Sequence, residues 1–403
     1  MEGSSSIVDW LPKRDWRATF GSLVISDQRG EQVSTRLPSV ESFRVLAILA
    51  VILWHTGFVS SLSQLVNDNF LIVLTGYLVW WVGVPYFLIT AGYFFRRSVM
   101  AEGNPVVAFR RYVSPLAWLL FVWMCIYILI PDSWPAQILH RGLWQPFISE
   151  ALKNIHLLES QHIHLFLDGQ RPVWHLWFLP ALMFSLSALT LMAVYRLERC
   201  VIPLIIGLYV LALTEEIAGG SFLNSSVYLG LWMNACLLTA IGWWLAGRER
   251  FPVAMACSLI VGGYVLALME GTVMDAVLHS SRQAIRGHNF LGGIVLSTGI
   301  FVFALAKPRL GQSTPFPFLA QFTLGVYLSH IFVIYTLRPI IWKLGKVIPL
   351  QAVLVAIVVY ALSVLFTAAV VRLPIVQYLV VKLVRKGGNE RLQRQTQTTK
   401  ETA

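Results

Sequence analysis

The sequence predicts an all-α integral membrane protein that crosses the bilayer about ten times. Of its 403 residues, 57% are hydrophobic and only 13% are charged, and the mean hydropathy is +0.67. A soluble globular protein would carry roughly 25% charged residues. The apolar residues also gather in runs of about 20, which is the length of a helix that crosses a bilayer.

Ten such runs are predicted to be spans, and the basic residues between them indicate the orientation. The spans lie at residues 43–63, 70–94, 113–131, 173–195, 200–218, 226–246, 252–270, 287–306, 317–338 and 348–371. With both termini in the cytoplasm, the inside segments hold 22 Lys and Arg residues and the outside segments hold 8. This distribution follows the positive-inside rule and favours that orientation.

The chain is therefore expected to have three parts. A polar cytoplasmic tail covers residues 1–42, a membrane domain covers 43–372, and a basic cytoplasmic tail covers 373–403. One long loop, at about 132–172, is predicted to lie outside the membrane. The net charge of +11 comes from basic residues between the apolar runs, so topology explains it and no nucleic-acid partner is expected.

Metal and disulfide sites are not predicted. The long loop holds four of the nine histidines, of which His162 and His164 are the nearest neighbours. A separation of two residues does not put side chains on one helix face, so a metal site is the less favoured interpretation. The four cysteines show no CxxC spacing and no paired framework.

Two ionisable residues interrupt the first span. Arg44 and His55 lie eleven residues apart in the run FRVLAILAVILWHTGF. Eleven steps of about 100° return to nearly the same helix face, about 16 Å further along the axis. Ionisable residues inside a span usually face a protein interior and serve a function. We therefore expect Arg44 to grip an anion near the cytoplasmic surface, with simple end anchoring as the alternative, and His55 to move a proton deeper inside.

Other candidate residues are predicted deep in the membrane, near its outer surface and at its cytoplasmic face. His330 lies at a depth similar to that of His55, and His175 is predicted near the outer surface beside Trp177. For His175, a place in the interfacial aromatic belt is an equal alternative to chemistry. Four arginines gather at the cytoplasmic face, where topology alone explains them and ligand binding is the alternative: Arg96, Arg97, Arg110 and Arg111.

Four segments resemble the acyltransferase-3 family of membrane enzymes. They are ESFRVLAILAVILWH, GVPYFLITAGYFF, VWHLWFLPALMFSL and FTLGVYLSHIFVIY. Each is a weak hydrophobic motif by itself. All four occur in the family's order and on the matching spans, so the resemblance extends over roughly residues 40–372.

The resemblance implies transfer of an acyl group, acetyl above all, from cytoplasmic acetyl-CoA or another acyl-CoA. The acceptor would be a sugar hydroxyl of an exported or surface polysaccharide or of its lipid-linked precursor, at a bacterial inner membrane and beside polysaccharide-assembly proteins. Arg44 and His55 would be the functional pair, with His55 as general base or acyl relay. The four cytoplasmic arginines would hold CoA phosphates. His330, Tyr327, His175 and Trp177 would support the substrate, and no cofactor would be permanently bound.

The sequence departs from the family pattern at two places, and one alternative function stays open. Ser114 and Pro115 stand where the family often has a second Arg, and Ala91 replaces a usual Ser. A multi-pass transporter or flippase, with Arg44 and His55 as substrate or proton sites, is the alternative function. Broken helices at 83–85 and 91–92 would fit either class. No internal repeat is visible, which disfavours many transporter folds.

Overall fold

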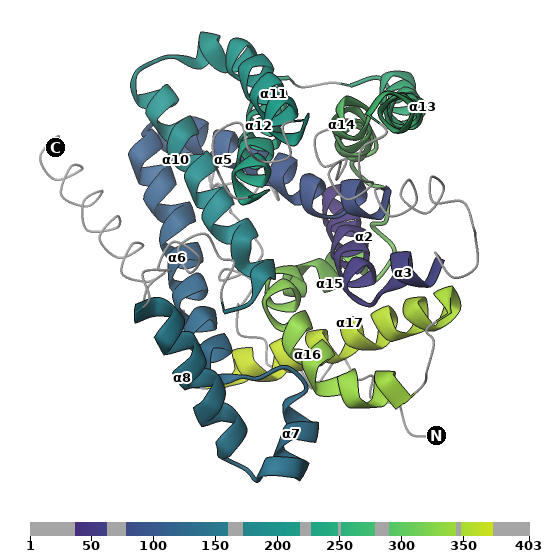
Figure 1. The fold of residues 1–403 in the computed structure, drawn as a ribbon. Coiled ribbons are helices and arrows are strands. Elements are labelled where there is room, and N and C mark those ends of the chain that lie inside the picture. The colour runs from purple at the N-terminus through teal and green to yellow at the C-terminus, as the bar shows by residue number, and fades with distance from the viewer. Residues whose placement is uncertain are drawn as a thin grey trace, which may run out of the picture. The chain divides into compact units, whose positions relative to one another are not determined.

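Helices of very different length make up the structure, a computed structural model that describes residues 37–62, 78–159, 172–217, 227–248, 251–278, 290–343 and 348–373 (Figure 1). No strand occurs among these residues, which confirms the all-α prediction. Most of the two predicted tails, together with His162 and His164, lies outside the described residues. Residues 37–370 form one compact unit, to which the descriptions below apply.

Each of the ten predicted spans contains a described helix. The elements, in chain order, are α2 (Pro38–His55), α3 (Phe58–Leu62), α5 (Val84–Glu102), α6 (Pro105–Leu129), α7 (Trp134–Arg141), α8 (Gln145–Glu159), η2 (Trp174–Trp177), α10 (Phe178–Val194), η3 (Glu198–Cys200), α11 (Val201–Ile217), α12 (Val227–Leu245), α13 (Val253–Leu278), α14 (Leu291–Ala306), α15 (Phe316–Leu319), η4 (Ala320–Phe322), α16 (Thr323–Lys343) and α17 (Pro349–Arg372). Within the described ranges, 7 helices are long and apolar enough to cross a membrane, and two apolar helices are shorter. The count of ten and the side of the termini therefore stay predictions.

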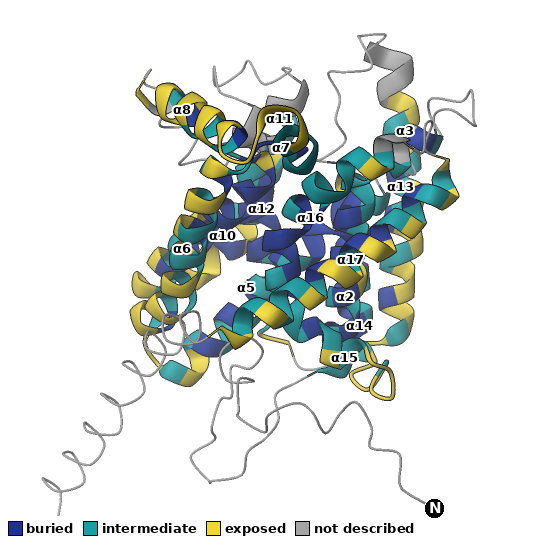
Figure 2. Ribbon diagram, turned by 90° about the horizontal axis from the view of Figure 1, so that it is seen from below, coloured by how far each residue is buried: buried dark blue, intermediate teal, exposed yellow. Residues whose placement is uncertain are grey.

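The exposed surface of the unit is largely apolar on its peripheral helices. Large side chains such as Phe121 on α6, Val261 on α13 and Leu365 on α17 are 58%, 62% and 65% exposed. Figure 2 shows buried residues in the centre of the bundle and exposed ones along its flanks, with α7 and α8 at one end and α15 at the other. Exposed apolar faces on long helices are what contact with lipid chains requires.

A short turn joins α5 to α6 and brings the predicted cytoplasmic arginines to one end. Gly103 ends α5 with a φ of 65°, a left-handed conformation that glycine adopts without strain. Asn104 then caps α6, because its side chain accepts hydrogen bonds from the backbone amides of Val106 and Val107 at 2.9 and 3.2 Å. Arg96, Arg97, Arg110 and Arg111 all lie within ten residues of this turn.

One of the two predicted helix breaks is wrong. The chain is non-helical at Gly83, directly before α5, but α5 continues without interruption through Ala91 and Gly92. Gly92 instead serves close packing, since a Cβ there would lie 2.0 Å from the Thr239 carbonyl oxygen of α12. Gly242 of α12 makes the reciprocal approach to the Ile89 carbonyl of α5, where a Cβ would lie at 1.9 Å. Small residues at such crossings let two membrane helices touch through their backbones.

Candidate active site

The last turn of α2 presents His55 at the wall of a pocket. His55 is the final residue of the helix, and Thr56 and the left-handed Gly57 follow it. The Thr56 hydroxyl donates to the carbonyl oxygen of Ala352 on α17 at 3.3 Å, which fixes the end of α2 against that helix. His55 is partly exposed, and its side chain lines the pocket.

Three histidines from separate elements meet here. The ring centroids of His55 and His330 are 5.2 Å apart, and those of His175 and His330 are 5.1 Å apart. His330 comes from α16 and is fully buried, whereas His175 comes from η2 and is 2% exposed. His55 and His175 line the pocket, and His330 lies against both rings.

The hydrogen bonds of His330 determine where its proton lies. Its Nδ1 is 2.6 Å from the carbonyl oxygen of Tyr327 and 3.2 Å from that of Val326. A carbonyl oxygen only accepts, so Nδ1 carries the hydrogen, and in the neutral ring Nε2 is a hydrogen-bond acceptor. This Nε2 atom is buried and has no hydrogen-bond partner among the described residues. Such atoms are costly in a core, at about 1–3 kcal/mol each, and are suited to bind a hydroxyl.

Two tyrosines hold the histidine cluster in place. The Tyr327 hydroxyl donates to the backbone carbonyl of His175, which ties α16 to η2. The Tyr127 hydroxyl from α6 donates to the carbonyl of Leu328 at 2.7 Å and accepts from the amide of Phe332 at 3.2 Å. These two α16 residues are four apart, so Tyr127 bridges the helical turn that carries His330.

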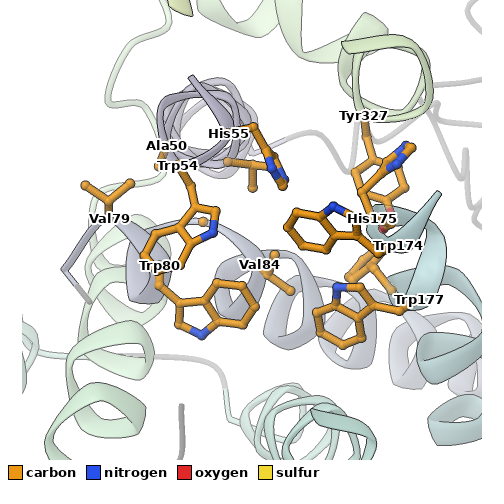
Figure 3. Close-up of a pocket in the computed structure, with 13 residues that line it drawn as sticks. Ala50, Trp54, His55, Val79, Trp80, Val84, Trp174, His175, Trp177 and Tyr327 are labelled. Atoms are coloured by element: carbon orange, nitrogen blue, oxygen red, sulfur yellow. The ribbon is translucent and has the colours of Figure 1, made fainter. Parts of the chain in front are cut away.

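Aliphatic residues and tryptophans together line the pocket (Figure 3). Small and aliphatic residues come from the C-terminal half of α2 and from the residues around Gly83: Ala50, Val51, Val79, Gly83 and Val84. Four tryptophans also line it, Trp54 and Trp80 on the side of Ala50 and Val79, and Trp174 and Trp177 on the side of His175. The Trp80 and Trp177 rings stack with centroids 6.2 Å apart, and the Trp174 ring lies 4.7 Å from that of His55.

The structure places Arg44 on α2 as expected, but in an ion pair. Its Nη1 atom is 3.1 Å from Glu41 Oε2, one turn earlier in the same helix. The two side chains are only 21% and 12% exposed. An anion that binds Arg44 would therefore share it with Glu41 or displace that carboxylate.

The other predicted arginines have different surroundings. Arg96 donates to the Trp243 carbonyl at 3.2 Å, and its guanidinium lies 5.4 Å from that residue's ring. Arg97 lies 5.8 Å from the ring of Tyr93, and Arg111 pairs with Glu102 at 2.7 Å. Arg110 is exposed and makes no ion pair or ring contact within the described part of the chain.

Of the predicted site residues, His55, His175, His330, Tyr327 and Trp177 lie together at one place. None of the five arginines lines the pocket: Arg44 precedes His55 by eleven residues on α2, and the others lie near the α5–α6 turn. An interfacial belt place for His175 and Trp177 does not fit, since they are only 2% and 4% exposed.

Sequence reasoning did not single out Tyr127, Trp54, Trp80 or Trp174. Trp54 and Trp174 directly precede His55 and His175, and this adjacency is a signal that could have found them. Tyr127 and Trp80 have no such neighbour, so only the packing of α6 and of residues 78–82 reveals them.

Comparison with known proteins supplies the class of enzyme. The comparisons with curated proteins and with solved structures returned no match. The family model of the acyltransferase-3 family, described as "Acyltransferase domain", matches residues 37–371. This range contains the histidine cluster, the pocket and all five candidate arginines. The chain therefore belongs to the acyltransferase-3 family and is a membrane acyltransferase.

Proposed function

We propose that this acyltransferase moves an acetyl group from cytoplasmic acetyl-CoA to a sugar hydroxyl of an exported or surface polysaccharide or of its lipid-linked precursor. The membrane domain at 43–372 would do this in a bacterial inner membrane, with both tails in the cytoplasm. Polysaccharide-assembly proteins would supply the acceptor. Membership in an acyltransferase family favours this function over the transporter alternative.

The observation that carries the proposal is the position of His55. Its imidazole lines a pocket, and a second imidazole lies behind it at 5.2 Å. A histidine has a side-chain pKa suited to proton transfer to and from a hydroxyl, and general base catalysis contributes typically 10²–10⁴-fold. A base must also be oriented by a further group, and His330 is the neighbour suited to that role.

In the proposed reaction the acceptor oxygen attacks the carbonyl carbon of the acetyl thioester. His55 takes the proton of the acceptor hydroxyl as the new C–O bond forms. The C–S bond then breaks, and the CoA sulfur leaves with the electron pair and takes up a proton from His55. An acyl-His55 intermediate is the alternative route, in which the acetyl group first passes to the imidazole and then to the acceptor.

The donor would bind at the end of the bundle where α2 begins. Arg44 and the arginines near the α5–α6 turn would hold the phosphates of CoA, since guanidinium groups bind phosphate through paired hydrogen bonds. Of these arginines, Arg97 and Arg110 form no ion pair with an acidic side chain within the described ranges. The pantetheine arm would then run along α2 from Arg44 toward His55.

A transfer assay on the purified, reconstituted protein tests this function. Labelled acetyl-CoA and the glycan acceptor are supplied, and acetylated glycan is measured. We expect His55→Ala to lower kcat by about 100-fold or more. His140→Ala and His156→Ala are matched controls, because both histidines are exposed on α7 and α8. Transfer at the wild-type rate by His55→Ala would overturn the role of His55, and wild-type protein without transfer from any thioester would overturn the function.

A further inference from the structure

The helix α8 carries four exposed apolar side chains on one face, which we call the apolar stripe. They are Trp144, Ile148, Leu152 and Ile155, and each is between 46% and 71% exposed. The Ile148 amide donates to the Trp144 carbonyl oxygen at 3.1 Å, so Trp144 belongs to the first turn of the helix. At about 100° per residue, the four positions fall within about 80° of one another around the helix axis. The stripe ends at Glu159, the last residue of α8.

A polar face lies directly beside the apolar stripe. Its side chains are also exposed, and they are Gln145, Ser149, Lys153 and His156. They continue around the helix from about 100° to about 180° past Trp144. A helix with adjoining apolar and polar exposed faces is typical of one that lies in the plane of a membrane surface, and a tryptophan is common at that depth.

The third face of α8 packs on the bundle and determines where the apolar stripe lies. Asn154 is 2% exposed, and its Nδ2 atom donates to the carbonyl oxygen of Ile128 on α6 at 3.1 Å. Ile155 of the stripe directly follows Asn154, and the exposed Leu129 of α6 directly follows Ile128. The stripe is therefore next to the exposed apolar surface of α6, which is one of the peripheral helices suited to contact with lipid chains.

The hairpin formed by α7 and α8 is also fixed to α16. Asp132, before α7, forms an ion pair with Arg338. The Trp134 indole nitrogen donates to the Thr336 hydroxyl at 3.1 Å, and the Trp134 ring stacks on that of Phe332 with centroids 6.2 Å apart. Because α8 packs against both α6 and α7, these contacts hold it in one orientation at the end of the bundle (Figure 2).

We propose that the apolar stripe lies in the lipid of the membrane leaflet at this end of the bundle, with the polar face of α8 toward water. The loop that contains α7 and α8 is then an interfacial anchor and not a segment wholly in water. Lipid is the occupant that matches the adjoining surface of α6, and immersion removes the large apolar side chains from water. The proposal does not depend on the reaction that the protein catalyses.

Spin labels on single cysteines test the environment of both faces. The four native cysteines are first replaced by alanine, and the labelled variants are Ile148→Cys and Leu152→Cys on the stripe and Ser149→Cys and Lys153→Cys on the polar face. The protein is placed in nanodiscs of phosphatidylethanolamine and phosphatidylglycerol. Val261→Cys on the exposed apolar surface of α13 is the control for lipid contact.

Electron paramagnetic resonance then measures collisions of each label with oxygen, which concentrates in lipid, and with a nickel chelate, which stays in water. We expect the ratio of oxygen to nickel collisions at positions 148 and 152 to approach that at 261 and to exceed that at 149 and 153 several-fold. Equal ratios on the two faces would overturn the proposal, because the stripe would then stand in water. Few collisions of either kind at 148 and 152 would also overturn it, because protein would then cover the stripe.

A charge on the apolar stripe gives a second measurement that needs no label. We expect Leu152→Glu to lower the unfolding temperature in the same nanodiscs by several degrees, because a charged side chain is costly in lipid. Ser149→Glu is the matched control on the polar face and should unfold close to the wild-type temperature. Equal unfolding temperatures for the two variants would contradict lipid contact at the stripe.

Discussion

The imidazole of His330 donates a hydrogen bond from Nδ1 to the carbonyl oxygen of Tyr327, with 2.6 Å between the two atoms. This bond within α16 turns the acceptor nitrogen, Nε2, away from its own backbone. The rings of His55 and His175 lie 5.2 and 5.1 Å away, and the buried Nε2 of His330 has no hydrogen-bond partner among the described residues. His330 is therefore expected to orient the neighbouring imidazole.

Replacement of His330 should separate this positioning role from packing. We expect His330→Gln to retain more transfer activity than His330→Leu, because the glutamine oxygen can accept a hydrogen bond from a neighbouring imidazole and leucine cannot. Loss of the acceptor should lower kcat about tenfold or more, with little change in the KM of the donor. The measurement is steady-state kinetics in the acetyl-transfer assay.

A purely structural role predicts the opposite order. Leucine is apolar and well accommodated in a buried site, whereas glutamine places a polar amide there. Equal or higher kcat for His330→Leu would therefore contradict the positioning role. Thermal stability of both variants in detergent, measured in parallel, shows whether the fold is kept.

Tyr127 is expected to affect catalysis through α16. Its hydroxyl bridges Leu328 and Phe332, on either side of His330, so Tyr127→Phe removes two hydrogen bonds at a cost of about 1 kcal/mol each. We expect a fall in kcat of about tenfold and a donor KM within about twofold of wild type. Tyr195→Phe is the matched control, since Tyr195 is 70% exposed. Unchanged kcat in Tyr127→Phe would show that this bridge does not position the cluster.

The helices were predictable from the sequence because a bilayer imposes a simple rule on it. Runs of about 20 apolar residues mark spans, and each predicted run contains a described helix. The break expected at Ala91 and Gly92 was wrong. A glycine in a span can allow either a bend in the helix or a close contact with another helix, and the sequence does not show which. Only the approach of Thr239 on α12 distinguishes the two.

The proximity of His55 and His330 could be expected from the sequence, because both residues lie at a similar depth along their predicted spans. The position of His175 was harder to predict, because the packing of η2 determines it. His175 has tryptophan neighbours typical of an interface, but η2 turns it inward against Tyr127, 5.3 Å away between ring centroids. The Glu41–Arg44 pair has the i, i+3 spacing of a helical ion pair and could have been found from the sequence.

The crossing of α5 and α12 should tolerate no side chain at its two glycines. A Cβ at Gly92 would lie 2.0 Å from a backbone oxygen of α12, and a Cβ at Gly242 would lie 1.9 Å from one of α5. We expect Gly92→Ala and Gly242→Ala to force the helices apart and to lower the yield of folded protein, at a cost of about 1–3 kcal/mol or more.

Fluorescence-detected size-exclusion chromatography of tagged variants measures this yield. Gly262→Ala on α13 is the matched control, because a Cβ there meets nothing within 4 Å. Alanine is a better helix former than glycine by about 1 kcal/mol, so the control should fold at least as well as wild type. Wild-type yields for Gly92→Ala and Gly242→Ala would contradict the close backbone contact.

The ion pair between Glu41 and Arg44 gives a sharp test of the donor site. If Arg44 holds a CoA phosphate, Glu41 competes with that phosphate for the guanidinium. Removal of the competing charge in Glu41→Gln should then lower the donor KM by roughly two- to fivefold, the strength typical of such a partly exposed pair. Arg44→Ala should raise the donor KM, and it should do so less at high salt, where charge contributes less.

The acceptor KM serves as the internal control for both variants, because the acceptor is not expected to contact the beginning of α2. Lys153→Ala is a matched charge control, since Lys153 pairs with Glu150 at the same i, i+3 spacing on α8. An anchoring role for Arg44 predicts a different result. In that case Glu41→Gln and Arg44→Ala would change stability together and leave the donor KM unchanged, because no phosphate would compete for the guanidinium.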